Sequence, residues 1–242
     1  MSQIFNPFNM RKLFLFIFLY FLVFNSFGQL DAIGTFNRFV IETWSAQYVR
    51  IGNYKVKGTP LLFGDAFPGK IKFQGASASQ PAKVMYNLYE QKAGPGTNGE
   101  MLVTDQLVEE FTLELPEKFG GVPLSFKHCS MFTKDNLKVY FNVLVEGSSL
   151  AFLKVYKIRM IADPSNMMDK ELKVFEQYYD YYLINYKGSG KVEQVKLKKK
   201  DIEKELGSLP GAAAIFKSNE FEYGTEADVI KLVNALNYAA SK

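Results

Sequence analysis

The chain has 242 residues, of which 48% are hydrophobic and 22% are charged, and its formal net charge at pH 7 is +4. That charge is too small for its field to predict a polyanion partner. A single cysteine, Cys129, and a single histidine, His128, exclude an internal disulfide and the usual structural zinc sets.

The first residues are typical of a secretory signal peptide. Arg11 and Lys12 precede the apolar run 13–24, and small residues follow that run. As a helix the run would span about 18 Å, well short of the ~30 Å hydrocarbon core that a membrane anchor must cross. The sequence therefore predicts a signal peptide at 1–28, cleavage between Gly28 and Gln29, and an exported chain that is periplasmic or extracellular, with no transmembrane segment in its mature part.

The mature chain is predicted to contain an antiparallel β domain at 29–198 and a C-terminal helical cap at 199–242 that packs on the sheet. Aromatic, β-branched or alternating runs separated by Gly, Pro, Asn and Ser indicate the strands. The early runs lie at 36–52, where a short helix is an alternative, and at 54–57, 70–73, 82–91, 101–105 and 107–115. Residues 92–100 are rich in turn formers, and we expect a loop there.

Two hairpins follow in the sequence. The first covers 137–161 and turns at 147–149, and the second covers 175–197 and turns at 187–190, with a loop at 162–171 between them. Neither face of the strand at 150–161 is purely polar. We therefore expect one side to be covered, or its lysine stems to lie along apolar surface.

The segment KLKKK, residues 196–200, raises the question of a basic site. Val195 and Leu197 point to one face of a strand and Lys196 and Lys198 to the other, so this is a strand end with a solvated face. A short helix should follow, with Asp201 in its first turn and Gly207 at the C′ position. Nearby glutamates offset the charge, and we expect no nucleic-acid partner.

The C-terminus is predicted to be helical. Thr225 and Asp228 form a capping box, and an apolar stripe follows them. The helices must bury their apolar faces, and the sheet offers the only large apolar surface. The fold class is therefore mainly β (α+β), an antiparallel sheet with a C-terminal cap of two or three short helices, and the sequence leaves open whether the sheet is curved or partly barrel-like.

Few residues suggest catalysis. His128 and Cys129 are neighbours, and neighbours on a strand point to opposite faces, so we do not expect them to form a nucleophile–base pair. The sequence has no nucleophile elbow, EF-hand or phosphate loop. We predict no catalytic residue, no metal site and no cofactor, and expect Cys129 to be a small buried hydrophobic residue. Paired acids of the glycosidase type remain an alternative. The candidates are Asp65, Glu109, Glu110, Glu114, Asp163, Glu176 and Asp180.

The tyrosine-rich run 178–186 gives the best binding signal. Tyr178, Tyr182 and Tyr186 share one face of the predicted strand, and Tyr179 and Tyr181 share the other. At least one row should lie in the core. The other could form an exposed platform for a glycan, a peptide or another chain, although packing on both sides is the simpler interpretation.

The order of several motifs resembles a family of uncharacterised signal-peptide-bearing proteins common in Bacteroidota. The motifs are GTPLLFGDAFPGKIKFQG, VMYNLYEQ, FNVLVEGSSLAFLKVYKI and YYDYYLINYKGSGKVEQVKLKKKDIEKELG, which together run from about residue 52 to residue 237. This chain differs by an insertion-like stretch at 116–136. The resemblance implies a periplasmic or secreted location and supplies no catalytic residues.

These observations favour a non-catalytic exported envelope protein, a binding or assembly module whose partner is an envelope protein or glycan. The alternative is a carboxylate-dependent hydrolase that acts on envelope glycans and holds two acids about 5–10 Å apart in one cleft.

Overall fold

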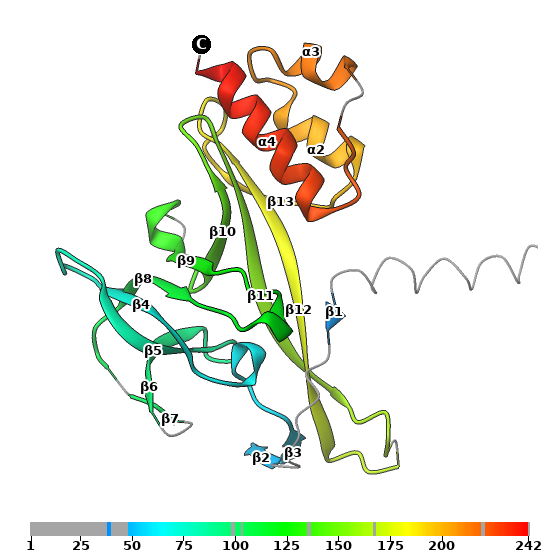
Figure 1. Cartoon of the computed structure of the whole chain (residues 1–242). Coiled ribbons are helices and arrows are strands. Elements are labelled where there is room, and N and C mark those ends of the chain that lie inside the picture. The colour runs from blue at the N-terminus through cyan, green and yellow to red at the C-terminus, as the bar shows by residue number, and fades with distance from the viewer. Residues whose placement is uncertain are drawn as a thin grey trace, which may run out of the picture. The chain divides into compact units, whose positions relative to one another are not determined.

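The structure is a computed structural model that describes residues 38–39, 48–97, 100–102, 104–134, 137–166, 168–218 and 221–241. The predicted leader at 1–28 and its cleavage point lie outside these residues, as does most of the predicted strand at 36–52. All described residues except Arg38 belong to one unit, Phe39–Lys242, shown in Figure 1.

The strands are short at the N-terminal side and long near the middle of the sheet. They are β1 (Arg38–Phe39), β2 (Tyr48–Ile51), β3 (Tyr54–Lys57), β4 (Phe67–Phe73), β5 (Gln80–Asn87), β6 (Lys92–Thr97), β7 (Glu100–Met101), β8 (Val108–Leu113), β9 (Leu124–His128), β10 (Tyr140–Glu146), β11 (Leu150–Ala162), β12 (Leu172–Asn185) and β13 (Val192–Val195).

One sheet orders these strands as β2-β3-β12-β11-β10-β9-β8-β4-β5-β6-β7, and β13 pairs with the free part of the β12 edge. The order starts at β2 and ends at β7, so the sheet formed by the described strands is not closed, a point that the sequence left open. Along this order and in the pairing of β13 with β12, only β3 with β12 is parallel. The sheet is therefore mixed, with the predicted antiparallel pattern elsewhere.

Both predicted hairpins form. The first joins β10 to β11 and the second joins β12 to β13. Between them, β11 and β12 pair along their whole length, from Leu150↔Asn185 to Ala162↔Lys173. Each strand carries apolar side chains on both faces, as expected from the sequence, because both faces of this pair are covered over part of their length.

Two strands form where turns or an insertion were expected. Residues 92–97 form β6 and Glu100 begins β7, where a loop was expected. Gly96 permits this, because a Cβ there would lie 2.2 Å from Met85 Sδ on the adjoining β5. The insertion-like stretch supplies β9, an inner strand between β8 and β10. Neither strand alternates clearly enough in the sequence to be recognised alone.

Three helices close the chain: α2 (Lys199–Leu206), α3 (Ala212–Lys217) and α4 (Glu226–Ala240). They lie against the end of the sheet where β10, β11, β12 and β13 meet (Figure 1). Thr225 caps α4 as predicted, because its Oγ1 accepts the Asp228 backbone N–H at 3.2 Å. Gly207 is the C-cap of α2, with a right-handed conformation at φ −65°, rather than the C′ residue expected from the sequence.

Two hydrophobic clusters lie on the same face of β11. The aromatic cluster includes Tyr156 and rings from β5, β8, β9 and β10. The aliphatic cluster includes Phe152 and the buried stripe of α4, namely Val229, Leu232, Val233 and Leu236. Lys154 lies between Phe152 and Tyr156 on this face. A third, smaller cluster around Leu153 and Val155 covers part of the opposite face.

Candidate functional site

The tyrosine-rich strand β12 does not present an open aromatic platform. Tyr181 is buried and its ring stacks on Phe152 with centroids 5.4 Å apart. Tyr179 is half-buried and contacts both Tyr156 and Tyr181. This row therefore belongs to the packed interior, which confirms that at least one row lies in the core.

The ammonium group of Lys154 lies among these rings. Its Nζ is 4.1 Å from the centroid of the Tyr179 ring and 2.8 Å from Glu226 Oε2. The Tyr181 hydroxyl donates to the same carboxylate oxygen at 2.9 Å. Burial, followed by the nearby Glu226 charge, raises the pKa of Tyr181. These contacts of Lys154, Tyr181 and Glu226 join the first turn of α4 to the sheet between the two clusters and stabilise the helical cap.

The other tyrosine row pairs with cations across β11. Lys157 Nζ is 2.7 Å from Asp180 Oδ2 and 3.2 Å from the Tyr182 hydroxyl. The Arg159 guanidinium lies 5.5 Å from the centroid of the Tyr178 ring. Only Tyr186 is clearly exposed, at 39%. Tyr178 and Tyr182 thus each contact a cationic side chain of β11, whereas Tyr186 lies farther along the strand and is exposed.

His128 and Cys129 are closer than strand geometry predicted. β9 ends at His128 and a short 3-10 helix, η4 (Cys129–Met131), begins at once, so the side chains do not alternate. The Cys129 Sγ lies 3.9 Å from His128 Nε2, and the argument from opposite faces was wrong. The thiol is buried, as expected, and contacts the Leu137 carbonyl. His128 Nδ1 accepts the Ser130 backbone N–H, and burial lowers the pKa of His128.

Three of the acids proposed as a catalytic pair, Glu109, Asp163 and Glu176, make local contacts. Lys72 pairs with Glu109 at 3.7 Å, and Arg159 Nε lies 2.5 Å from Glu176 Oε2. Asp163 accepts hydrogen bonds from the Ser165 hydroxyl and backbone, which lower the pKa of Asp163. None of the acids proposed from the sequence lines the pocket described next.

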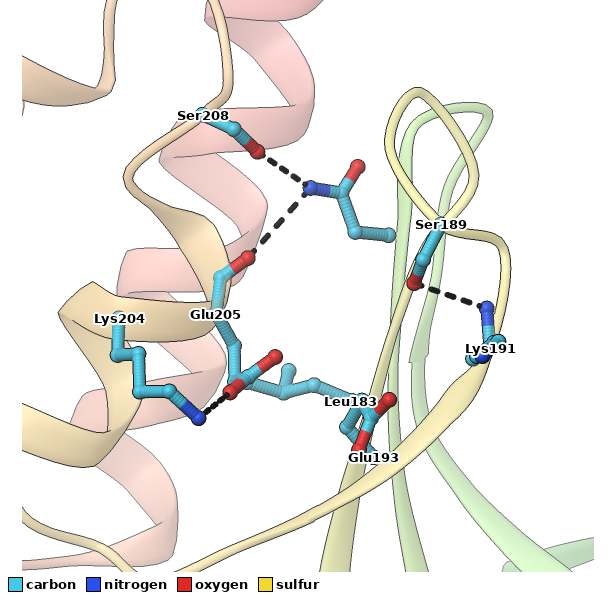
Figure 2. Close-up of a pocket in the computed structure, with 8 residues that line it drawn as sticks. Leu183, Ser189, Lys191, Glu193, Lys204, Glu205 and Ser208 are labelled. Carbon is cyan, nitrogen blue, oxygen red and sulfur yellow. Dashed lines mark hydrogen bonds and ion pairs between the residues drawn. The ribbon is translucent and has the colours of Figure 1, made fainter.

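A pocket of about 200 Å³ lies between the β12–β13 hairpin and α2. In Figure 2, Lys204, Glu205 and Ser208 approach it from the helix side, and Ser189, Lys191 and Glu193 approach it from the hairpin side. Buried Leu183 and Asn185 complete the lining. The pocket is therefore a polar recess at the rim of the aliphatic cluster.

Asn185 fixes the two walls of this pocket. Its Nδ2 donates to Ser208 Oγ at 3.1 Å, and its Oδ1 accepts the Lys187 backbone N–H at 3.1 Å. The turn must be narrow here, because a Cβ on Gly188 would lie 2.9 Å from Asn185 Nδ2. The KGSGK turn is thus held by a buried amide, which preforms the recess.

The pocket carries balanced charge. Lys204 Nζ donates to Glu205 Oε1 at 2.9 Å. This hydrogen bond and the Glu205 charge raise the pKa of Lys204, and Glu193 adds a smaller effect in the same direction. Two acids and two lysines therefore surround one recess.

Sequence reasoning missed this site. It recognised residues 187–190 as a turn and placed α2 correctly, but only pairing of β12 with β13 and packing of α2 bring the two together. The sequence signal that could have pointed to it is the alternation of Lys191 and Glu193, which puts both side chains on one face beside the turn.

Within the described ranges, no three His, Cys, Asp or Glu side chains gather as metal ligands would. The helices in this part of the chain are also too short or too polar to cross a bilayer. Fold and site together define a mainly β protein with an open mixed sheet, a helical cap and one small polar pocket. A scan against protein-family models, a search of curated proteins and a search of solved structures each found no match.

Proposed function

We propose that this protein is exported and works as a non-catalytic binding module of the cell envelope, with its ligand or partner bound at the pocket between the β12–β13 hairpin and α2. The pocket geometry carries the proposal. Its walls come from two elements that a buried asparagine joins, and its lining offers hydrogen-bonding groups rather than an activated nucleophile.

Export rests on the leader pattern of the sequence. Arg11 and Lys12, the apolar run 13–24 and the small residues after it are features that secretory signal peptides share. The mature protein should begin at Gln29. Cell fractionation followed by intact-mass measurement tests this, and a protein that retains residues 1–28 in the cytoplasm would contradict it.

Binding is tested with isolated envelope material. The wild-type protein should be retained when envelope fragments are sedimented. The double variant K191A/E193A should lose most of that retention, because it removes two charged groups from one pocket wall. K187A is the matched control, since Lys187 lies in the same hairpin but does not line the pocket. Equal retention of both variants would place the binding surface elsewhere.

A carboxylate-dependent hydrolase is the second candidate, and one observation favours it: Glu193 and Glu205 line the same pocket. A glycosidase acts through two carboxyl groups that flank the scissile bond. Incubation with envelope glycan should then release new reducing ends, and E193Q and E205Q should each abolish that release. If wild-type protein releases none, the acids serve binding alone.

A further inference from the structure

Several hydrogen-bond donors of the pocket are available to a ligand. Ser189 Oγ accepts the Lys191 backbone N–H at 3.2 Å, and Ser208 Oγ accepts from Asn185 Nδ2, so each hydroxyl hydrogen is available to a ligand. The Asn185 side chain uses its own groups within the wall. The Lys191 ammonium adds further donors. A ligand group that meets these residues must therefore be an acceptor, and a carboxylate suits them best.

The charged acceptors of the pocket are two carboxylates, one on each wall (Figure 2). Glu193 is opposite Leu183 in the β12–β13 register, and Glu205 approaches from α2. Lys204 pairs with Glu205 through Oε1 only. Among the described residues, neither Lys191 nor Glu193 forms an ion pair. One lysine and one glutamate on the same strand face thus present unused charges of opposite sign.

The size of the recess limits its occupant. About 200 Å³ is below the ~300–1,000 Å³ of pockets that hold drug-sized ligands, and corresponds to roughly seven water volumes. Leu183 gives the recess an apolar floor, so a short aliphatic part can be buried between the two charged ends.

We propose that this pocket binds a small zwitterion that carries one carboxylate and one ammonium group, of the size of a free amino acid. The carboxylate contacts Lys191 and the hydroxyls of Ser189 and Ser208, and the ammonium contacts Glu193. This inference rests on the proposed function, since it names the ligand class of the same site.

The test is an NMR titration of the full-length protein with L-alanine and two matched fragments. Propionate keeps the carboxylate and isopropylamine keeps the ammonium. L-alanine should shift the backbone amides of residues 189–193 and 208, with a dissociation constant about tenfold below that of either fragment, as expected when a second charge-assisted contact is added. Equal affinity for alanine and a fragment would overturn the proposal.

Three variants locate the site. K191A and E193Q should each weaken L-alanine binding about tenfold, because each removes one charged contact, while K187A should leave it unchanged. Unchanged binding in K191A and E193Q would contradict the assignment. Both variants change exposed or half-buried side chains, so their folded state can be verified from the unshifted amides of the cap.

Glucose separates this inference from the proposed function. If glucose shifts the same amides and L-alanine does not, the inference of a zwitterionic ligand is wrong, and the pocket remains the binding site of the module. If K191A/E193A also loses envelope retention while L-alanine fails to bind, the same conclusion holds. If no probe binds and retention is unaffected, both proposals fail.

Discussion

The aromatic and aliphatic clusters bury side chains on the same face of β11 but are built differently. The aromatic cluster joins rings from strands that are spread over the sheet, and Phe111 stacks on Phe126 with centroids 4.6 Å apart. The aliphatic cluster joins two consecutive hairpins to the three helices that follow them in the chain. The first depends on distant strand pairing and the second on amphipathic segments that the sequence itself reveals.

That difference explains which parts of the fold were predictable. The hairpins, the capping residue Thr225 and the stripe of α4 follow local rules of period, turn and cap, and all were predicted from the sequence. Strands β6 and β9 were missed, because Gly94, Pro95 and Gly96 interrupt one and the other is short. Their pairing partners, not their own residues, make them strands.

The same distinction holds for the candidate site. The two tyrosine rows were assigned correctly to opposite faces of the strand. The charged groups that contact the inner row, Glu226 and Lys154, come from α4 and β11 and were not predicted. The pocket depends on a contact between a turn and a helix that no local pattern indicates. The sequence therefore could not show which residues of different strands and helices lie side by side.

The largest effect is expected in the aromatic cluster. Phe126 is fully buried and contacts Phe111, Tyr86 and Tyr156. Phe126→Ala should lower the free energy of unfolding by about 3–5 kcal/mol, as ring deletion leaves a cavity. Urea denaturation measures this. Phe126→Leu is the control and should lose less, because it keeps most of the side-chain volume, and equal losses would show that the ring contacts rather than the filled volume determine the cost.

The helical cap provides the next test. Asn237 on α4 accepts the Leu150 backbone N–H at 2.8 Å and donates to the Leu150 carbonyl at 3.2 Å. Asn237→Ala leaves the buried Leu150 N–H without this acceptor, while the Leu150 carbonyl still accepts the Gly147 backbone N–H at 2.9 Å, and should cost about 1–3 kcal/mol. The adjacent Gly147 leaves no room, since a Cβ there would lie 2.3 Å from Asn237 Cγ. Gly147→Ala should therefore be clearly less harmful in the Asn237→Ala background, whereas additive losses would contradict this contact.

The ion pair of Lys154 and Glu226 should contribute less to the free energy of unfolding than either Phe126 or Asn237. The Lys154 side chain is 11% exposed and that of Glu226 is 33% exposed, so water screens the pair in part. Lys154→Met and Glu226→Gln should each cost about 1–2 kcal/mol, with the apolar stem of Lys154 kept. A double-mutant cycle isolates the coupling. A coupling energy near zero would show that the two clusters are joined by apolar contacts alone.

The smallest effect concerns pH at the edge of the aromatic cluster. Burial lowers the pKa of His128 below its ordinary 6.5. The unfolded chain therefore binds this proton more readily, and the stability that His128 contributes is complete above pH 6.5 and declines as the pH falls below it. Denaturation midpoints between pH 7.5 and about 5 should fall more for wild type than for His128→Asn, which can retain the cap of η4. Equal falls in the denaturation midpoints of wild type and His128→Asn would contradict the predicted loss of stability at low pH.

The parallel pairing of β3 with β12 has a consequence for how the molecule is made. Lys55 sits beside Leu172 in that ladder, so β3, which is synthesised early and pairs with β2, finds this second neighbour only when most of the polypeptide has emerged. Until then the backbone amides on that edge of β3 face water or a chaperone. The N-terminal edge should be the last part to dock in nascent chains, and any truncation before residue 172 should leave it without a template.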